Sequence, residues 1–372
     1  MRLKSGSLIP ISFPIKRIVL YTSSHGYGHA ARSVVLLRKL APHYEVRVKT
    51  QIPQEFFTGY LGDTVSWTRQ KVDVGCVQKN YLDVDAKKTF LQYRKFLKTR
   101  DAYLQKERDW LLKNNVDLVV CDIASFPLKA ASMAELPGIL VANFTWYDIY
   151  SGLPGSENYR DILGFLKDEY SSATIHFLPQ FIIKNDLPTP KKITGFISLK
   201  GQSKRKELER QLLIDNKTIV FIYLGFYDVS FMQWKNLELL KDYVFITRDP
   251  HNNPPKNLYV LDKSFSYPDL IASADLVISK CGYSTLSAAF HHGKPVVACD
   301  RDDFCEAEII RKFIIQNNVG VILQPNLFNA CDWGNAIKKA SLLTVKNKVC
   351  LHGENVVAQE IAKLLGTLPD NS

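Results

Sequence analysis

The chain has 372 residues, which is long for a single hydrophobic core and favours two domains. With 46% hydrophobic and 23% charged residues it has the composition of a globular protein, which excludes a disordered or fibrous one. The formal charge of +11 indicates an anionic partner, such as a membrane surface or a phosphorylated or lipid-linked molecule, while nucleic acid is not expected. The alternative is that the charges lie on solvated helix faces.

The N-terminal segment and the cysteines indicate the cell compartment. The sequence contains no run of 18 apolar residues, so we expect no helix that spans a membrane. The N-terminal segment MRLKSGSLIPISFPIKR lacks the continuous apolar stretch of a secretory signal. The seven cysteines are an odd number without a C-x-x-C pair, which predicts reduced thiols and argues against disulfides and a zinc site. We therefore expect a cytoplasmic protein, with peripheral association at the inner face of the membrane as an option.

Short β-branched segments alternate with helical patterns along the whole chain. The expected strands of the first half are RIVLYT, YEVRVKT, DLVVCD, GILVAN and TIHFL, and those of the second half are TIVFIYL, YVFIT, NLYVL, DLVIS and PVVAC. Strands that alternate with helices form parallel sheets covered on both faces. We predict an α/β fold of two doubly wound, Rossmann-like domains that face each other across a cleft.

Two segments of the chain resemble each other. DLVVCD begins at Asp117 and DLVISK at Asp275, and in both segments a proline opens the next expected strand 20 residues later. This repeat predicts one doubly wound domain in residues 1–198 and another in 199–372, with the charged segment 186–216 as the linker. The last helical pattern, ENVVAQEIAKLLG, belongs to the second domain in sequence, with packing against the N-terminal domain as an alternative.

A glycine-rich loop, SHGYGHAARS, follows the first expected strand. It formally fits the G-x-G-x-x-A fingerprint of dinucleotide-binding folds. However, the second strand ends in Lys49 and Thr50, where that fingerprint needs an acidic residue for a ribose hydroxyl. Only a cofactor with a 2′-phosphate remains conceivable, so a dehydrogenase is a remote alternative and we expect no cofactor.

Histidines explain this loop better. His29 lies in the first turn of a helix, where the helix dipole disfavours the imidazolium form, as a general base requires. Asp122 ends another strand of the same sheet and is placed to fix the tautomer of the ring. The alternatives are a capping or packing histidine and an N-cap aspartate. The residues of second rank on this side are His25, Gly28, Arg32 and Trp146.

In the second half, polar residues follow three strands. Gly282, Tyr283, Ser284 and Thr285 open a helix after a strand, which predicts an anion site suited to a diphosphate, or else an ordinary capped turn. Gly225 follows the first strand of this half, where a backbone can approach a phosphate closely. The segment CDRDDFCEAE offers carboxylates for sugar hydroxyls, for a divalent metal if they converge, or only for helix stability.

A basic segment with interleaved aromatic residues, KKTFLQYRKFLKTR, spans residues 87–100. It predicts an amphipathic helix that rests on anionic lipid and brings the cleft near a lipid-borne acceptor. The alternative is a helix that turns Phe90, Tyr93, Phe96 and Leu97 into the core, which is the commoner arrangement and the one we favour.

The residues HGYGHAARS, DLVVCD, NFTWYDIY and GYSTLSAAFHHGKPVVACDRDDFCEAE resemble segments of GT-B glycosyltransferases. They are similar to the glycosyltransferase-like region of plant arabinokinases and, more distantly, to UDP-glycosyltransferases and the lipid II N-acetylglucosaminyltransferase. The resemblance touches both halves of the chain in matching order.

The resemblance implies a role for each candidate residue. His29 would be the base that deprotonates the acceptor hydroxyl, and Asp122 would orient it. The C-terminal domain would hold the donor, with its diphosphate at residues 282–285 and its sugar against Asp302 and Glu306. No metal would take part.

The implied activity is the transfer, with inversion, of a hexosyl or N-acetylhexosaminyl group from a UDP-linked donor to a hydroxyl acceptor held by the N-terminal domain. The chain departs from the pattern at Ala288, where many relatives carry a glutamate that holds the ribose hydroxyls. This departure keeps two alternatives open: a nucleotide-sugar-binding module without turnover, and a nucleotide-sugar epimerase on the same fold.

Overall fold

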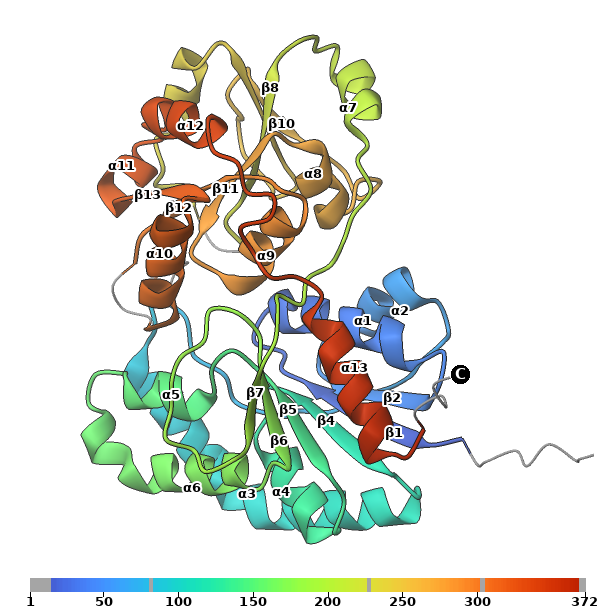
Figure 1. Cartoon of the computed structure of the whole chain (residues 1–372). Coiled ribbons are helices and arrows are strands. Elements are labelled where there is room, and N and C mark those ends of the chain that lie inside the picture. The colour runs from blue at the N-terminus through green and yellow to red at the C-terminus, as the bar shows by residue number, and fades with distance from the viewer. Residues whose placement is uncertain (1–14, 80–82, 226–228, 302–304, 368–372) are drawn as a thin grey trace, which may run out of the picture.

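Two parallel sheets divide the molecule into two halves (Figure 1). The computed structural model describes residues 15–79, 83–225, 229–301 and 305–367. The first sheet has the strand order β3-β2-β1-β4-β5-β6-β7 and the second has the order β10-β9-β8-β11-β12-β13. All pairings within these sheets are parallel, which confirms the prediction of two doubly wound α/β units.

The first half contains seven strands and six α-helices among the described residues. Its strands are β1 Arg17–Thr22, β2 Glu45–Thr50, β3 Ser66–Arg69, β4 Leu118–Asp122, β5 Gly138–Val141, β6 Ile175–Leu178 and β7 Lys191–Ile193. Its helices are α1 Tyr27–Leu40, α2 Gln54–Leu61, α3 Ala86–Lys113, α4 Phe126–Met133, α5 Trp146–Ser151 and α6 Arg160–Ser171, with a short 3-10 helix, η1, at Ser156–Tyr159.

The second half and the C-terminal helix complete the chain. The strands are β8 Thr218–Tyr223, β9 Tyr243–Thr247, β10 Leu258–Val260, β11 Leu276–Lys280, β12 Val296–Cys299 and β13 Gly320–Leu323. The helices are α7 Arg205–Leu212, η2 Trp234–Leu239, α8 Tyr267–Ser273, α9 Tyr283–His291, α10 Cys305–Asn317, α11 Pro325–Asn329, α12 Gly334–Ser341 and α13 Gly353–Leu364.

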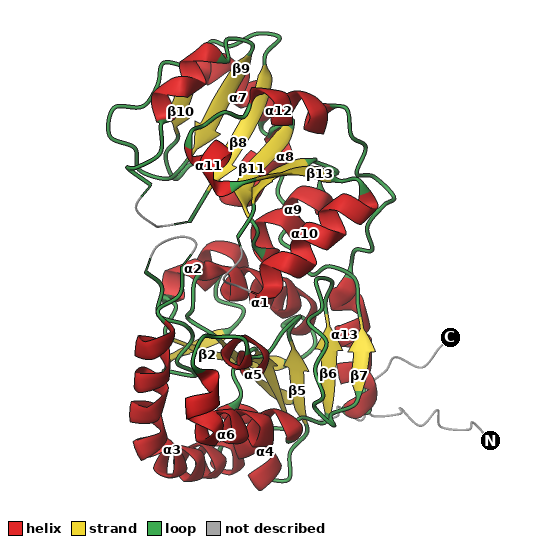
Figure 2. Ribbon diagram, turned by 90° about the vertical axis from the view of Figure 1, so that its left-hand side faces the viewer, coloured by secondary structure: helices red, strands yellow, loops and turns green. Residues whose placement is uncertain are grey.

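Helices cover both faces of each sheet (Figure 2). In the first half, α1, α2 and α13 share one apolar core with the sheet, and α3, α4, α5 and α6 share the other. In the second half, α7 to α10 lie on one face and α11 and α12 on the other. The central strands are buried on both faces, which explains why they read as continuous apolar runs in the sequence.

The two aspartates of the internal repeat occupy matching places. The Asp117 carboxylate accepts the backbone N–H of Arg17 at the start of β1, at 2.8 Å. The Asp275 carboxylate accepts the N–H of Ile219 in β8, also at 2.8 Å. Each aspartate therefore accepts a hydrogen bond from the beginning of the neighbouring central strand. The two similar sequence segments thus have the same local structure.

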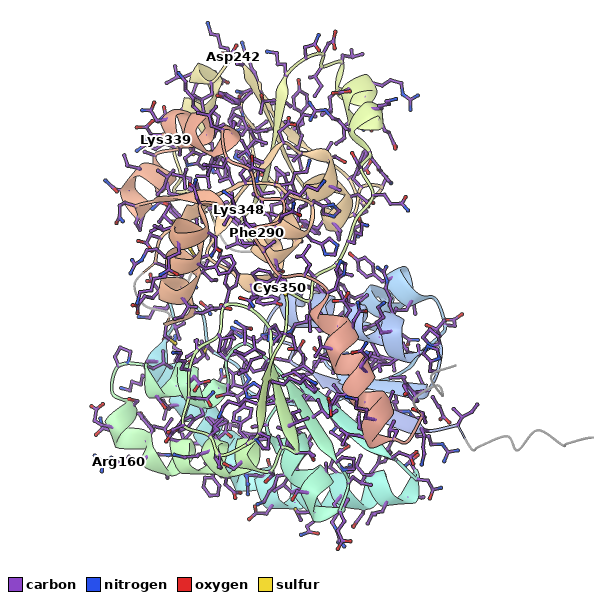
Figure 3. All side chains as sticks on the ribbon, in the orientation of Figure 1. Arg160, Asp242, Phe290, Lys339, Lys348 and Cys350 are labelled. Carbon is purple, nitrogen blue, oxygen red and sulfur yellow. The ribbon has the colours of Figure 1, made fainter. Side chains whose placement is uncertain are left out.

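The chain passes twice between the halves, and the two crossings touch each other. The N–H of Phe196 donates to the carbonyl of Cys350 at 2.8 Å, and Figure 3 shows Cys350 at the level where the halves meet. A Cβ on Gly353 would lie 2.2 Å from the carbonyl oxygen of Gly195, so the backbones are in direct contact. Beyond this point α13 packs against α1 in the core of the first half (Figure 1).

The aromatic residues of α3 face inward. Phe90, Tyr93 and Phe96 are all buried in the core of the first half, and Leu97 packs against the same core. The alternative of a core-facing helix is therefore correct, and these rings are not available to a lipid surface. The lysines and arginines between them remain exposed.

The stability of the fold is expected to depend on pH through His176. This residue of β6 is fully buried, with Nε2 2.8 Å from the Ala142 carbonyl, and burial lowers its pKa from 6.5 to about 4. Between these two pH values the unfolded chain binds a proton that the folded chain does not, so the free energy of unfolding falls by about 3 kcal/mol as the pH is lowered through this window. Urea unfolding measures the effect, and His176→Gln should show a shallower pH dependence. An unchanged slope would contradict this assignment.

Candidate active site

The sheet topology creates one switch point in each half. In the first sheet the chain order reverses between β1 and β4, and in the second it reverses between β8 and β11. Ligands of doubly wound sheets bind beyond the carboxyl ends of the strands at such points. Thr22 and Asp122, which end β1 and β4, are paired directly. The loops that follow these four strands are therefore the places where functional residues are expected.

A cavity of about 410 Å³ lies between the halves at these two switch points. Residues from both halves line it, so neither sheet forms it alone. The predicted residues among its lining are His25, Gly28, His29, Arg32, Gly225, Gly282, Tyr283, Ser284, Thr285 and Glu306.

His29 and Asp122 are in contact, as the sequence predicted. The His29 Nδ1 atom lies 2.9 Å from Asp122 Oδ1, and the side chain of His29 is 12% exposed while that of Asp122 is fully buried. Because the partner is a carboxylate oxygen, Nδ1 carries the proton and donates it, which leaves Nε2 as the unprotonated nitrogen. The pair therefore has the geometry of a general base and the residue that orients it.

Asp122 also forms an ion pair with Arg32. The Nε atom of Arg32 donates to Asp122 Oδ2 at 2.8 Å, and Nη2 donates to Oδ1. Burial alone would raise the pKa of Asp122, but the charge of Arg32 and the hydrogen bonds from Arg32 and His29 hold this pKa below its ordinary value. Asp122 is therefore ionised near neutral pH, although it has no exposure to solvent.

The start of α9 faces the cavity from the second half. Gly282 precedes the helix in an extended conformation and has no side chain to cap the first N–H groups. A Cβ on Gly28 would lie 2.7 Å from Ser284 Oγ, so α1 and α9 begin in close contact and a larger residue at position 28 would require the Ser284 hydroxyl to move. Free N–H groups and the helix dipole make this end suitable for a phosphate group.

Two cations beside α9 are residues that we did not single out from the sequence. Lys280 ends β11 and Arg301 follows β12, and both line the cavity. Burial and the charge of Arg301 lower the pKa of Lys280 to about 8, so it still carries a proton at neutral pH. Both follow the rule that led to the other candidates, because each lies at the carboxyl end of a strand. They add positive charge where a diphosphate would lie.

The acidic segment after β12 is only partly described. Asp302 lies outside the described residues. Glu306 lines the cavity, but its Oε1 accepts a hydrogen bond from Asn143 Nδ2 of the first half at 2.8 Å. Burial raises the pKa of Glu306. The predicted contact of Glu306 with the donor sugar stays a prediction, and the structure adds a bond between the halves that the sequence did not indicate.

Gly225 lines the cavity with a φ of 87°, a conformation that favours glycine.

His25 is neutral, and Trp146 lies behind it. Burial and the nearby His29, Lys280 and Arg301 lower the pKa of His25 to about 3, and its Nδ1 accepts the N–H of Cys76 at 3.3 Å. Trp146 is 1% exposed and packs edge-on against His25, with the centres of the two rings 5.2 Å apart. Its indole N–H donates to the Asp73 carboxylate. Trp146 therefore packs against the cavity-lining His25 without being among the residues that line the cavity, and its role on the acceptor side stays a prediction.

Lys49, where the dinucleotide fingerprint needs an acidic residue, is paired inside the first half. Lys49, at the end of β2, is 2% exposed and its ammonium group is paired with Glu107 of α3. The same ammonium group lies 3.2 Å from the centre of the Trp110 ring. Lys49 is therefore engaged inside the first half, and the expectation that the first loop binds no dinucleotide stays a prediction.

The described residues contain neither a metal-binding cluster nor a membrane-spanning helix. Within the described ranges, no group of three or more His, Cys, Asp or Glu side chains is arranged to hold a metal ion. Among the described helices, none is both long and apolar enough to cross a bilayer.

Comparison with solved structures identifies the class of fold. A UDP-glucosyltransferase from Polygonum tinctorium aligns over 96% of this chain and 100% of its own, with a TM-score of 0.67 and 13% identity. The calicheamicin glycosyltransferase CalG4 aligns with a TM-score of 0.64 and 15% identity over 95% of this chain and 99% of its own. MurG from Acinetobacter baumannii gives a TM-score of 0.56 and 14% identity over 94% and 100%. The chain has the GT-B fold of these glycosyltransferases.

Comparison of sequences supports the same resemblance. The chain is 26% identical to the L-arabinokinase of Arabidopsis thaliana over 317 residues. The match covers 81% of this chain but only 30% of that protein, so the chain spans under a third of the relative's length. No family model matches the sequence. These findings confirm the resemblance to GT-B glycosyltransferases and to an arabinokinase.

Proposed function

We propose that the protein is a metal-independent glycosyltransferase that moves a hexosyl or N-acetylhexosaminyl group from a UDP-linked donor to a hydroxyl acceptor with inversion. One observation carries the proposal: His29, bonded to ionised Asp122, and the start of α9 line the same cavity from opposite halves. A proton acceptor and a phosphate site that face each other are what transfer from a nucleotide-sugar requires.

The chemistry follows from the two sides of the cavity. The acceptor oxygen attacks the anomeric carbon from the face opposite the diphosphate, and His29 Nε2 takes the hydroxyl proton. Asp122 stabilises the imidazolium that forms, because its carboxylate is already ionised. The bond to the diphosphate breaks, and the leaving group gains the N–H groups of α9 together with Lys280 and Arg301.

Thermal shift with a panel of nucleotide-sugars tests donor binding first. A ligand at 100 times its Kd stabilises the folded state by about 2.7 kcal/mol, so the matching donor should stand out clearly. We expect a UDP-linked sugar to give the largest shift. A panel in which no nucleotide-sugar stabilises the protein would contradict the proposal.

A binding module without turnover is the second candidate, and Ala288 favours it. Ala288 lines a second pocket of about 120 Å³. Among the described residues that line this pocket, none is an aspartate or a glutamate. A ribose in that pocket would therefore lack the charged partner that the resemblance leads us to expect. Calorimetry together with product analysis separates the candidates: the module binds without transfer or hydrolysis, and an epimerase changes the donor when no acceptor is present.

The substitution Ala288→Glu is expected to tighten UDP binding about tenfold, because a carboxylate bonded to ribose hydroxyls contributes about 1.4 kcal/mol or more. Calorimetry with UDP and with 2′-deoxy-UDP measures the effect. The deoxy nucleotide serves as the control and should gain less. Equal weakening of both nucleotides would show that the ribose lies elsewhere.

We further propose that the acceptor is anionic or lipid-linked and that α3 meets an anionic surface through its exposed charges. Seven basic residues of this helix are exposed, and five of them lie in its N-terminal half: Lys87, Lys88, Arg94, Lys95 and Lys98. Each contributes about 1 kcal/mol near an anionic bilayer.

Flotation with anionic vesicles at low salt should show binding that Lys87→Glu/Lys95→Glu/Lys98→Glu abolishes. The same exchange at Lys338 and Lys339, which are exposed on α12, is the control and should leave binding intact. Equal binding to neutral vesicles would contradict the proposal.

A further inference from the structure

Arg32 lies one helical turn after His29 on α1 and is only 3% exposed. All three of its guanidinium nitrogens point to named acceptors. Two bond the Asp122 carboxylate, and Nη1 donates to Asn143 Oδ1 at 2.9 Å. None of the proposed steps of sugar transfer uses this buried cation, although it donates hydrogen bonds to both oxygens of the carboxylate that orients His29.

The Arg32 guanidinium group is also connected to the second half by a ring contact and by a chain of hydrogen bonds. Asn143, which accepts from Arg32, donates to Glu306 of α10 at 2.8 Å. The guanidinium carbon also lies 4.9 Å from the centre of the Tyr283 ring, at the start of α9. Tyr283 in turn accepts the N–H of Ile197, in the first crossing between the halves, at 2.9 Å. One side chain of the first half therefore contacts one helix of the second half directly and another through a single residue.

We propose that Arg32 is a positioning residue that couples the His29–Asp122 pair to the docking of the two halves, an inference that rests on the proposed function. The two parallel hydrogen bonds fix the plane of the Asp122 carboxylate, and that carboxylate fixes His29. The ring of Tyr283 and the bond from Asn143 to Glu306 restrain the guanidinium further, and these two contacts exist only while the halves are together. The base is therefore set in its working geometry when the cavity has closed around the donor.

Arginine suits this task and lysine does not. A guanidinium group presents its donors in a rigid planar fork, so it bonds both carboxylate oxygens and a third acceptor at once, and its flat face stacks on an aromatic ring. An ammonium group supplies a point charge that can keep the charge balance with Asp122 but cannot hold both the carboxylate and Asn143. Arg32→Lys therefore separates charge from geometry.

The first test is kinetic. In Arg32→Lys and Arg32→Ala, kcat is expected to fall about 10- to 100-fold because the base is misplaced, while the KM for the donor changes less than about threefold. Guanidinium chloride at millimolar concentration should restore part of the turnover of Arg32→Ala. Asn143→Ala leaves the Arg32–Asp122 bonds in place but removes the bond to Glu306, the acceptor of Arg32 Nη1 and a bond to the Phe181 carbonyl. It should also lower kcat, by about tenfold. Arg38→Met, an exposed arginine of the same helix, is the control and should behave as the wild type.

The second test needs no turnover, so it separates this proposal from the proposed function. In protein labelled with 15N-histidine, the Nδ1–H signal of His29, assigned by its loss in His29→Gln, should be protected in the wild type and in Arg38→Met and lost in Arg32→Ala. A protein that transfers no sugar from any donor would defeat the proposed function, and this signal would still decide on Arg32. The proposal is overturned if the signal persists in Arg32→Ala, if the wild type lacks it, or if Asn143→Ala leaves both kcat and the signal unchanged.

Discussion

Replacement of His29 by glutamine is expected to lower kcat for sugar transfer by 10²- to 10⁴-fold, which is the usual contribution of a general base. Glutamine keeps a polar side chain of similar size beside Asp122, but it cannot accept a proton from the acceptor hydroxyl. Donor affinity should remain, because the start of α9, Lys280 and Arg301 are untouched. The release of nucleoside diphosphate, measured with the best donor and acceptor, gives kcat, and calorimetry gives the affinity for the donor.

The control for this prediction is His43→Gln, an exposed histidine just beyond α1, which should keep full activity. The combination of unchanged donor binding and lost turnover is the result that assigns His29 to proton transfer. Unchanged turnover in His29→Gln would show that another group, or none, takes the proton.

Replacement of Asp122 by alanine is expected to destabilise the protein by about 3 to 5 kcal/mol and to abolish transfer. The loss of stability has a simple cause: Arg32 would remain buried with its positive charge and without a carboxylate. The loss of turnover follows because His29 would lose the acceptor of its Nδ1–H. Chemical denaturation measures the first effect and donor turnover the second.

Two variants make this prediction sharper. Asp101→Asn removes a carboxylate that is 89% exposed in its ion pair with Arg100 and should cost less than about 1 kcal/mol. The double variant Arg32→Met/Asp122→Leu removes both buried charges and should recover much of the stability without restoring turnover. If Asp122→Ala were as stable as the wild type, the buried ion pair could not have the role described here.

The contact between His29 and Asp122 could be predicted from the sequence because it depends on local rules. Asp122 ends one strand and His29 lies in the helix that follows another, and the strands of a doubly wound sheet bring their carboxyl ends to one edge. The same rule located the start of α9 at the cavity. Lys280 and Arg301 also lie at the carboxyl ends of strands, so the same rule predicts them at the cavity.

The sharing of Asp122 with Arg32 could not be predicted in this way. It depends on which side chain of α1 reaches the end of β4, and the Asn143–Glu306 bond joins residues 163 positions apart in different halves. Contacts of this kind depend on how the two sheets dock, which strand patterns do not encode. Trp146 shows the same limit, because its place behind the cavity wall depends on packing against His25 and Asp73.

The central claim is that this cavity transfers sugar from a nucleotide-linked donor. The most direct measurement incubates the wild type with the donor that stabilises it and a panel of hydroxyl acceptors, and follows nucleoside diphosphate together with the anomeric configuration of the product. We predict equal amounts of diphosphate and glycoside, with the configuration of the donor inverted, and a strong reduction in His29→Gln. Donor binding without any transfer or hydrolysis would contradict the account.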